Sequence, residues 1–297
     1  MTLWKHYHLA NTVEDALEAL CNAPGPVRLV SGGTDLLLDL EQGRHAPVET
    51  LVDVTQIPRL CALEYRREQL FIGAAVPLNH IVASPIVEEH AQALLEACAL
   101  IGGPQVRNTA TLGGNVGHAL PAADGTIALL ALNAQVEIAS PSGQRLQPIE
   151  DLFVGPGKST LETERDIILG FYLPLREASQ ASAFTRVMRP QGVALPIINM
   201  AAWIHREGEV IGDVRLSVGP SGPTPRRGRS AEQALIGRAP GESALEAALD
   251  ALLGESRFRT SPQRASADYR RHLVESLLRE SVLTAWARTL DSESVRS

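Results

Sequence analysis

The segment TATLGGNVGHALPAADG, residues 109–125, consists mostly of glycine, alanine and small polar residues. A second Gly-Gly pair stands in RLVSGGTDLLLDL, residues 28–40. Glycine reaches positive φ without a steric penalty and lets a ligand come into contact with the main chain. In a chain with ample Leu, Val and Ile, two such segments indicate that the backbone itself is used for binding.

The first glycine pair is predicted to lie between a strand and a helix. The strand VRLV is followed by Ser31, Gly32 and Gly33, and a helix is expected from Thr34 to Gly43. Backbone N–H groups that converge at a helix N-terminus form a hollow that suits phosphate. The alternative is a tight turn that binds nothing, and such turns are common.

The second pair repeats this chemistry and strengthens the first interpretation. Thr111 supplies a hydroxyl, Gly113 and Gly114 follow, and Asn115 carries both a donor and an acceptor. Two hollows in neighbouring units could hold a diphosphate from both sides. Asp124 either caps the helix that follows it or binds a sugar or ribityl hydroxyl, and the sequence leaves both roles open.

Other binding and catalytic motifs are absent from the sequence. No G-x-G-x-x-G fingerprint and no G-x-x-x-x-G-K-[ST] P-loop occurs, and GPGKST at 155–160 is interpreted as a loop. No G-x-S-x-G motif supports a serine hydrolase. His118 lies in the second glycine segment, but a lone histidine is more often structural. We therefore assign no catalytic residue.

Composition restricts the class of protein further. The 297 residues carry a formal net charge of −7, and no basic face suggests a nucleic-acid partner. Cys21, Cys61 and Cys98 are too far apart for a zinc or iron–sulfur site on this chain, and their number argues against a secreted disulfide framework. No signal-peptide core and no run of membrane-spanning length occurs. We therefore expect a cytoplasmic protein without a metal site of its own.

The order of predicted elements indicates an α+β protein of three units. Residues 1–56 form a small α/β unit, and residues 57–176 form a second, larger one. Residues 181–297 begin with three strands and continue with helices, which predicts an antiparallel sheet backed by helices.

Five motifs together resemble a known family. LVSGGTDL, PQVRNTATLGGN, PAADG, DIILGFYLP and FTRVMR resemble, in order and spacing, the FAD-binding medium subunits of molybdenum hydroxylases of the xanthine dehydrogenase, carbon monoxide dehydrogenase and 4-hydroxybenzoyl-CoA reductase type. The resemblance implies a two-part α/β FAD-binding domain, similar to that of vanillyl-alcohol oxidase, followed by an antiparallel sheet with helices. The reductases of this group carry an additional iron–sulfur loop after Gly-Gly-Asn, which this chain lacks.

The resemblance also implies which residues surround FAD. Arg186 stands where many relatives have Lys and would be a neighbour of the flavin, whereas Arg189 is expected as a structural ion-pair partner. Ile101 stands where relatives often have an aromatic side chain, so we expect weaker stacking there. The implied cofactor-binding residues are Leu29, Val30, Ser31, Gly32, Gly33, Thr34, Asp35, Leu36, Ile101, Thr111, Leu112, Gly113, Gly114, Asn115, Asp124, Ile168 and Arg186.

The implied role is electron transfer within a complex. The molybdenum cofactor is expected on a molybdopterin large subunit and two [2Fe–2S] clusters on an iron–sulfur small subunit. FAD on this chain would pass the electrons to an external acceptor, NAD⁺ or a quinone. Two alternatives stay open: a flavoprotein oxidoreductase that acts alone, and a non-catalytic FAD-binding regulator or assembly protein.

Overall fold

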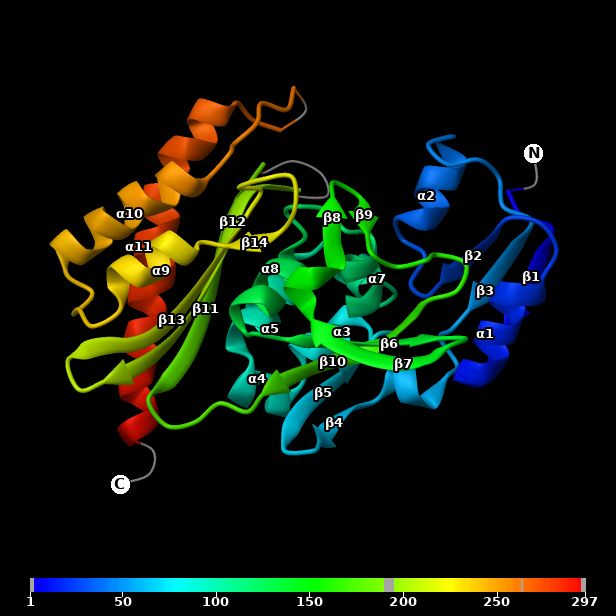
Figure 1. Cartoon of the computed structure of the whole chain (residues 1–297), viewed down its shortest axis with the longest axis horizontal. Helices are drawn as coiled ribbons and strands as arrows, with labels where there is room; N and C mark the ends of the chain where they lie inside the picture. Colours follow the sequence, from blue (N-terminus) through cyan, green and yellow to red (C-terminus); the bar gives the residue numbers. More distant parts are fainter. Residues whose placement is uncertain (1–2, 190–194, 263, 295–297) are drawn as a thin grey trace.

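Three sheets lie in a row along the long axis of the molecule, with the chain's ends at opposite ends of the row (Figure 1). The computed structural model describes residues 3–189, 195–262 and 264–294. The mixture of helices and sheets confirms the predicted α+β class, and the antiparallel C-terminal sheet confirms the expected architecture of the last third.

The N-terminal sheet has three parallel strands in the order β1-β3-β2. Helix α1 begins after Thr12, whose hydroxyl accepts the amide hydrogen of Asp15 at 3.0 Å. Strand β1 was not predicted, because as an edge strand it is mostly exposed and carries no buried alternation. The elements are β1 His6–Leu9, α1 Val13–Asn22, β2 Val27–Val30, α2 Leu36–Glu41 and β3 Thr50–Asp53.

The central sheet has five antiparallel strands in the order β4-β5-β10-β6-β7. Residues 78–100 form three short helices, of which the second begins at Pro85, and a further short helix begins at Pro104. The elements are η1 Pro58–Cys61, β4 Leu63–Arg66, β5 Gln69–Gly73, α3 Leu78–Val82, α4 Pro85–His90, α5 Gln92–Leu100, α6 Pro104–Arg107, α7 Leu112–Gly117, α8 Asp124–Ala131, β6 Gln135–Ser140, β7 Gly143–Pro148, η2 Ile149–Leu152, β8 Phe153–Gly155, β9 Lys158–Ser159 and β10 Ile167–Pro174.

The C-terminal sheet has the strand order β11-β12-β13-β14, and helices α9 to α11 cover one of its faces (Figure 1). Helix α8 packs against β12 and β13, and all eight of its residues are buried. A helix that is apolar on every side is expected between two packed layers. The elements are β11 Gln180–Met188, β12 Pro196–Glu207, β13 Val210–Gly219, β14 Arg226–Arg227, α9 Arg229–Leu235, α10 Glu242–Glu255 and α11 Ala267–Ser294.

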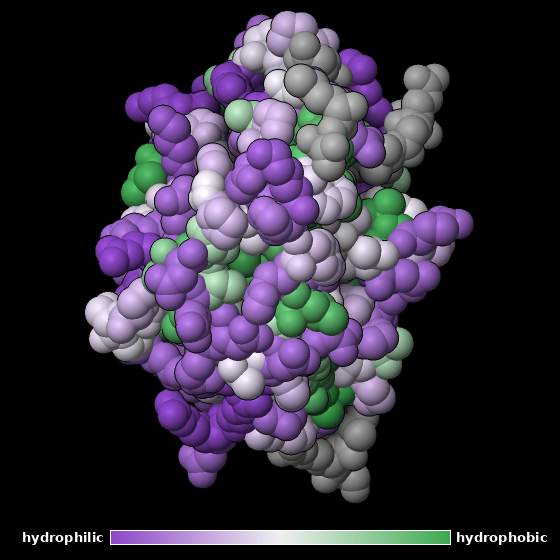
Figure 2. All heavy atoms as spheres, turned by 90° about the vertical axis from the view of Figure 1, so that its right-hand side faces the viewer, coloured by the Kyte–Doolittle hydropathy of each residue, from purple (hydrophilic) through white to green (hydrophobic). Residues whose placement is uncertain are grey.

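The GPGKST segment forms the turn between the short strands β8 and β9, with Gly157 at φ +67°. It therefore belongs to a hairpin, and its interpretation as a loop rather than a phosphate-binding P-loop is confirmed. Figure 2 shows the N-terminal end of the molecule, where hydrophilic residues dominate and hydrophobic residues form small separate patches. None of the helices in the described residues has the length and apolar character needed to cross a membrane.

Candidate cofactor site

The two glycine segments lie against each other. A Cβ atom added at Gly32 would stand 2.2 Å from the carbonyl oxygen of Thr109 and 2.7 Å from Cα of Ala110. Only glycine allows this approach, because any side chain would collide with the backbone of the second segment. Segments separated by almost eighty positions in the sequence are thus brought into direct contact.

The first segment turns sharply between β2 and α2. Gly33 has φ +67°, and its carbonyl oxygen accepts the amide hydrogen of Leu37 at 2.9 Å. Helix α2 begins at Leu36 rather than at the predicted Thr34, and its N-cap residue Asp35 makes no side-chain capping bond. The hydroxyl oxygen of Ser31 is buried and has no hydrogen-bond partner within the described chain. This segment therefore retains a hydroxyl that can bind a ligand.

In the second segment the glycine pair lies inside the first turn of α7. Thr111 is the N-cap of that helix, and its hydroxyl accepts the amide hydrogen of Gly114 at 3.1 Å. Gly113 packs on Ala74: a Cβ at Gly113 would lie 2.6 Å from the Ala74 carbonyl oxygen. Asn115 accepts the amide hydrogen of Thr126 at 3.3 Å and so connects α7 to α8.

Asp124 is the first residue of α8, and the N-cap position belongs to Ala123. The capping alternative is therefore wrong. The Asp124 carboxylate instead accepts one hydrogen bond from Arg186 Nη1 and one from Asn199 Nδ2, each at 2.6 Å. Burial raises the pKa of Asp124, whereas the Arg186 guanidinium and the Asn199 amide act to lower it. A buried carboxylate is tolerated here because it has a charged partner and two donors.

Arg186 connects the C-terminal sheet to helices α5 and α8. It lies on β11, pairs with Asp124, and donates to the carbonyl oxygen of Leu100 next to Ile101. The Asp124 and Arg186 side chains are 5% and 3% exposed. Arg186, rather than Arg189, thus forms the ion pair at this position.

Ile168 reaches the same region from β10. It is 8% exposed, and the carbonyl oxygen of the next residue, Leu169, accepts the amide hydrogen of Ala74 at 3.0 Å. Ala74 in turn contacts Gly113 of the second glycine segment. The structure therefore joins the five motifs through a continuous set of contacts.

The region also contains polar atoms that a ligand could satisfy. Buried polar atoms in folded proteins almost always have a hydrogen-bond partner. Within the described residues, three such atoms that lie in or directly beside the five motifs have none: Ser31 Oγ, Thr126 Oγ1 and Arg186 Nε. A hydroxyl-rich, anionic ligand such as FAD fits this set of donors and acceptors.

Asn199 was missed at the sequence level. It is 0% exposed on β12 and bonds Asp124, yet it belongs to none of the five motifs. The available signal is an amide within the apolar run PIINMAAWI, because such a side chain needs a buried partner.

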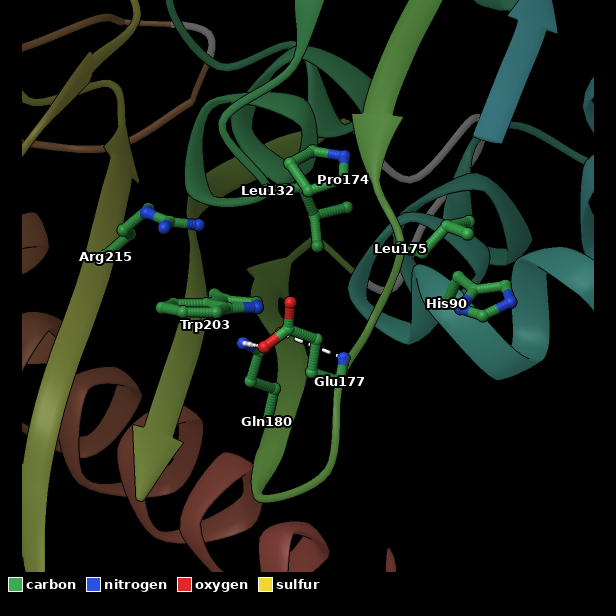
Figure 3. A pocket seen from close by; sticks show the side chains of 8 residues that line it. All are labelled: His90, Leu132, Pro174, Leu175, Glu177, Gln180, Trp203 and Arg215. Atoms are coloured by element: carbon green, nitrogen blue, oxygen red, sulfur yellow. Dashed lines mark hydrogen bonds between the residues drawn. The ribbon is translucent and has the colours of Figure 1, made fainter. Parts of the chain in front are cut away.

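A separate pocket of about 100 Å³ lies at the seam between the central and C-terminal units. Figure 3 shows Arg215, Glu177 and Gln180 near Trp203, whereas His90 lies on the other side beside Leu175. None of the predicted cofactor-binding residues lines it, and pockets for cofactors and drug-sized ligands are several times larger. The pocket therefore lies apart from the predicted cofactor-binding residues.

Comparisons with known proteins show which family the chain belongs to. Residues 3–176 match the FAD binding domain in molybdopterin dehydrogenase, and residues 182–285 match the CO dehydrogenase flavoprotein C-terminal domain. A xanthine dehydrogenase FAD-binding subunit of Escherichia coli O157:H7 is 31% identical, with 95% of this chain and 96% of that protein covered. The nicotine 6-hydroxylase medium subunit of Paenarthrobacter nicotinovorans is 33% identical, with 94% and 96% covered.

The fold is shared as well as the sequence. A solved structure of carbon monoxide dehydrogenase from Hydrogenophaga pseudoflava superposes with a TM-score of 0.90 at 28% identity, and 96% of this chain and 98% of that chain are covered. The chain therefore belongs to the family of FAD-binding medium subunits of molybdenum hydroxylases, as its five motifs predict, and is an FAD-dependent oxidoreductase subunit.

Proposed function

We propose that this chain binds FAD between its first two units and relays electrons within a molybdenum hydroxylase complex. The electrons would come from [2Fe–2S] clusters on an iron–sulfur small subunit and leave to an external acceptor, NAD⁺ or a quinone. The contact between Gly32 and the backbone of residues 109–110 is the observation that carries this proposal, because it brings both glycine segments to one site.

The chain's own residues would bind and orient the cofactor. Residues 29–36 and 111–115 would hold the diphosphate with backbone N–H groups and the Ser31 hydroxyl. Asp124 would accept a hydrogen bond from a ribityl or ribose hydroxyl, since each of its oxygens is bonded to one donor and can accept another. Ile101, Ile168 and Arg186 would lie near the flavin ring. FAD, when bound, supplies the redox chemistry, and the protein supplies placement and electrostatics.

The partners and the location belong to the same proposal. The chain lacks the cysteine spacing of an iron–sulfur protein, which fits clusters on a small subunit and a molybdopterin cofactor on a large one. We retain the division into residues 1–56, 57–176 and 181–297, of which residues 1–2, 190–194, 263 and 295–297 lie outside the described residues. A cytoplasmic location remains our expectation.

Purification of the full chain tests the proposal. We expect a yellow protein with flavin absorption bands, or a colourless one that gains them when FAD is added. Copurification with an iron–sulfur and a molybdenum subunit would support the complex, whereas turnover of a substrate by the isolated flavoprotein would favour the stand-alone enzyme. A chain that takes up no FAD would contradict the proposal.

A further inference from the structure

Asn199 makes an unusual set of contacts for a residue in the middle of a buried strand. Its neighbours Ile198 and Met200 are fully buried and apolar. Its Nδ2 donates to the Asp124 carboxylate at 2.6 Å and to the Ala122 carbonyl oxygen at 3.1 Å. Both bonds reach the N-terminal end of α8, so one amide fixes the start of that helix and the side chain of its first residue.

The two bonds to Asp124 come from neighbouring strands of the C-terminal sheet, where Arg186 and Asn199 are register partners. Asn199 on β12 binds Oδ1, and Arg186 on β11 binds Oδ2. Rotation of the carboxylate would break one bond or the other, and a buried polar group left without its partner is destabilising. The carboxylate is therefore held in one orientation before any ligand arrives, and such preorganisation strengthens binding.

We propose that Asn199 is a positioning residue for FAD, which holds the Asp124 carboxylate in the orientation that accepts a cofactor hydroxyl. Asn199 acts through Asp124 and is not assigned a contact with the cofactor. This inference rests on the proposed function, because it assumes that the chain binds FAD at Asp124.

Ser217 provides a matched control. It is fully buried on β13, and its hydroxyl donates to the carbonyl oxygen of Ile127 in α8 at 2.5 Å. Ser217→Ala and Asn199→Ala each remove a buried hydrogen bond between the C-terminal sheet and α8, but only Asn199→Ala frees Asp124. We expect both variants to lower the unfolding temperature. Asn199→Ala should weaken FAD binding by roughly tenfold, measured by titration of the full chain, and Ser217→Ala by less than about threefold.

The pH dependence of FAD affinity separates positioning from general destabilisation. Arg186 from β11, Arg264 from the segment before α11, and Cys98 from α5 also interact electrostatically with Asp124. Affinity should fall as the pH drops through the pKa of Asp124, because the protonated form is the weaker acceptor. Loss of the Asn199 donor raises that pKa, so in Asn199→Ala the fall should begin at a higher pH. Ser217→Ala should keep the wild-type profile.

Asn199→Asp keeps the shape of the side chain and serves if the alanine variant does not fold. Two facing carboxylates repel when both are ionised and share a proton at lower pH. FAD affinity of this variant should therefore rise as the pH falls, opposite to the wild type. If the wild type binds FAD and both Asn199 variants match Ser217→Ala in affinity and pH profile, this inference is wrong. A wild-type chain that binds no FAD overturns the proposed function itself.

Discussion

The two glycine pairs look equivalent in the sequence, but Gly32 of the first pair and Gly114 of the second have different surroundings. Gly32 leaves no space for a side chain, because the backbone of residues 109–110 occupies it. Within the described residues, a Cβ at Gly114 would meet only the Thr111 hydroxyl, at 3.2 Å. Gly32 is thus required by the fold. Space beside Gly114 is left open by the protein, which is what a ligand-facing position needs.

The hydroxyl groups of the two segments differ in the same way. Ser31 Oγ is buried without a partner, whereas Thr111 Oγ1 already accepts the amide hydrogen of Gly114. A free hydroxyl can bind a ligand, and a committed one stabilises its helix. Similar sequences therefore predict similar local structure without predicting which atoms remain available for binding.

The largest effect is expected from Gly32→Ala. The new methyl group would overlap the Thr109 carbonyl oxygen, and a backbone atom cannot move aside cheaply. We expect a loss of about 3 kcal/mol in unfolding free energy, at the upper end of overpacking effects. Thermal unfolding of the cofactor-free chain measures it. Gly117→Ala is the matched control, because no described atom outside its chain neighbours and the backbone of its own helix lies within 4 Å of the added Cβ. Equal unfolding temperatures for the two variants would contradict the assignment.

Gly114→Ala should separate binding from stability. A methyl group here suits the helix α7, since alanine is favoured over glycine by up to about 1 kcal/mol in a helix interior. The unfolding temperature of the cofactor-free chain should change little. FAD affinity should fall by roughly thirtyfold, about 2 kcal/mol, because the methyl group enters the space proposed for the cofactor. Wild-type affinity in a titration would show that Gly114 does not face FAD.

Ser31→Ala should have a smaller effect of the same kind. The variant removes a hydroxyl that has no partner in the described chain, so the stability of the cofactor-free protein should not fall. A lost hydrogen bond to a charged group costs about 1.5 kcal/mol or more, which predicts roughly tenfold weaker FAD binding. Ser31→Thr retains the hydroxyl and tests whether affinity follows that group. A stability loss without any change in affinity would assign Ser31 to the fold instead.

Patterns of residues close together in the sequence predicted several of the helices and strands. The three strands and the helices after residue 181 occur where the patterns of apolar residues place them. Strand β1 escaped detection because it is exposed at a sheet edge. The helix α7, which Thr111 caps and whose first turn contains the second glycine pair, was not predicted.

Long-range pairing could not be predicted from the sequence. Asp124 is a residue type that often caps helices. Only the fold shows that Arg186 and Asn199 donate hydrogen bonds to its carboxylate. These residues lie on strands more than sixty positions away, so no local pattern relates them. Family resemblance indicated Arg186 as a neighbour of the flavin. It did not indicate Asn199, which the topology of β11 and β12 brings to the same helix end.

The smallest effect is expected from Thr111→Ala, which tests the committed hydroxyl. Loss of an N-cap side chain costs about 1 kcal/mol, so the cofactor-free chain should unfold at a temperature lower by a few degrees. FAD affinity should change less than in Ser31→Ala, because Gly114 N–H, released from Thr111, becomes a possible donor to the cofactor. Thr111→Ser keeps the capping oxygen and should restore stability. If Thr111→Ala instead weakened FAD binding more than Ser31→Ala, the two hydroxyls would have exchanged roles, and the distinction between the glycine segments would fail.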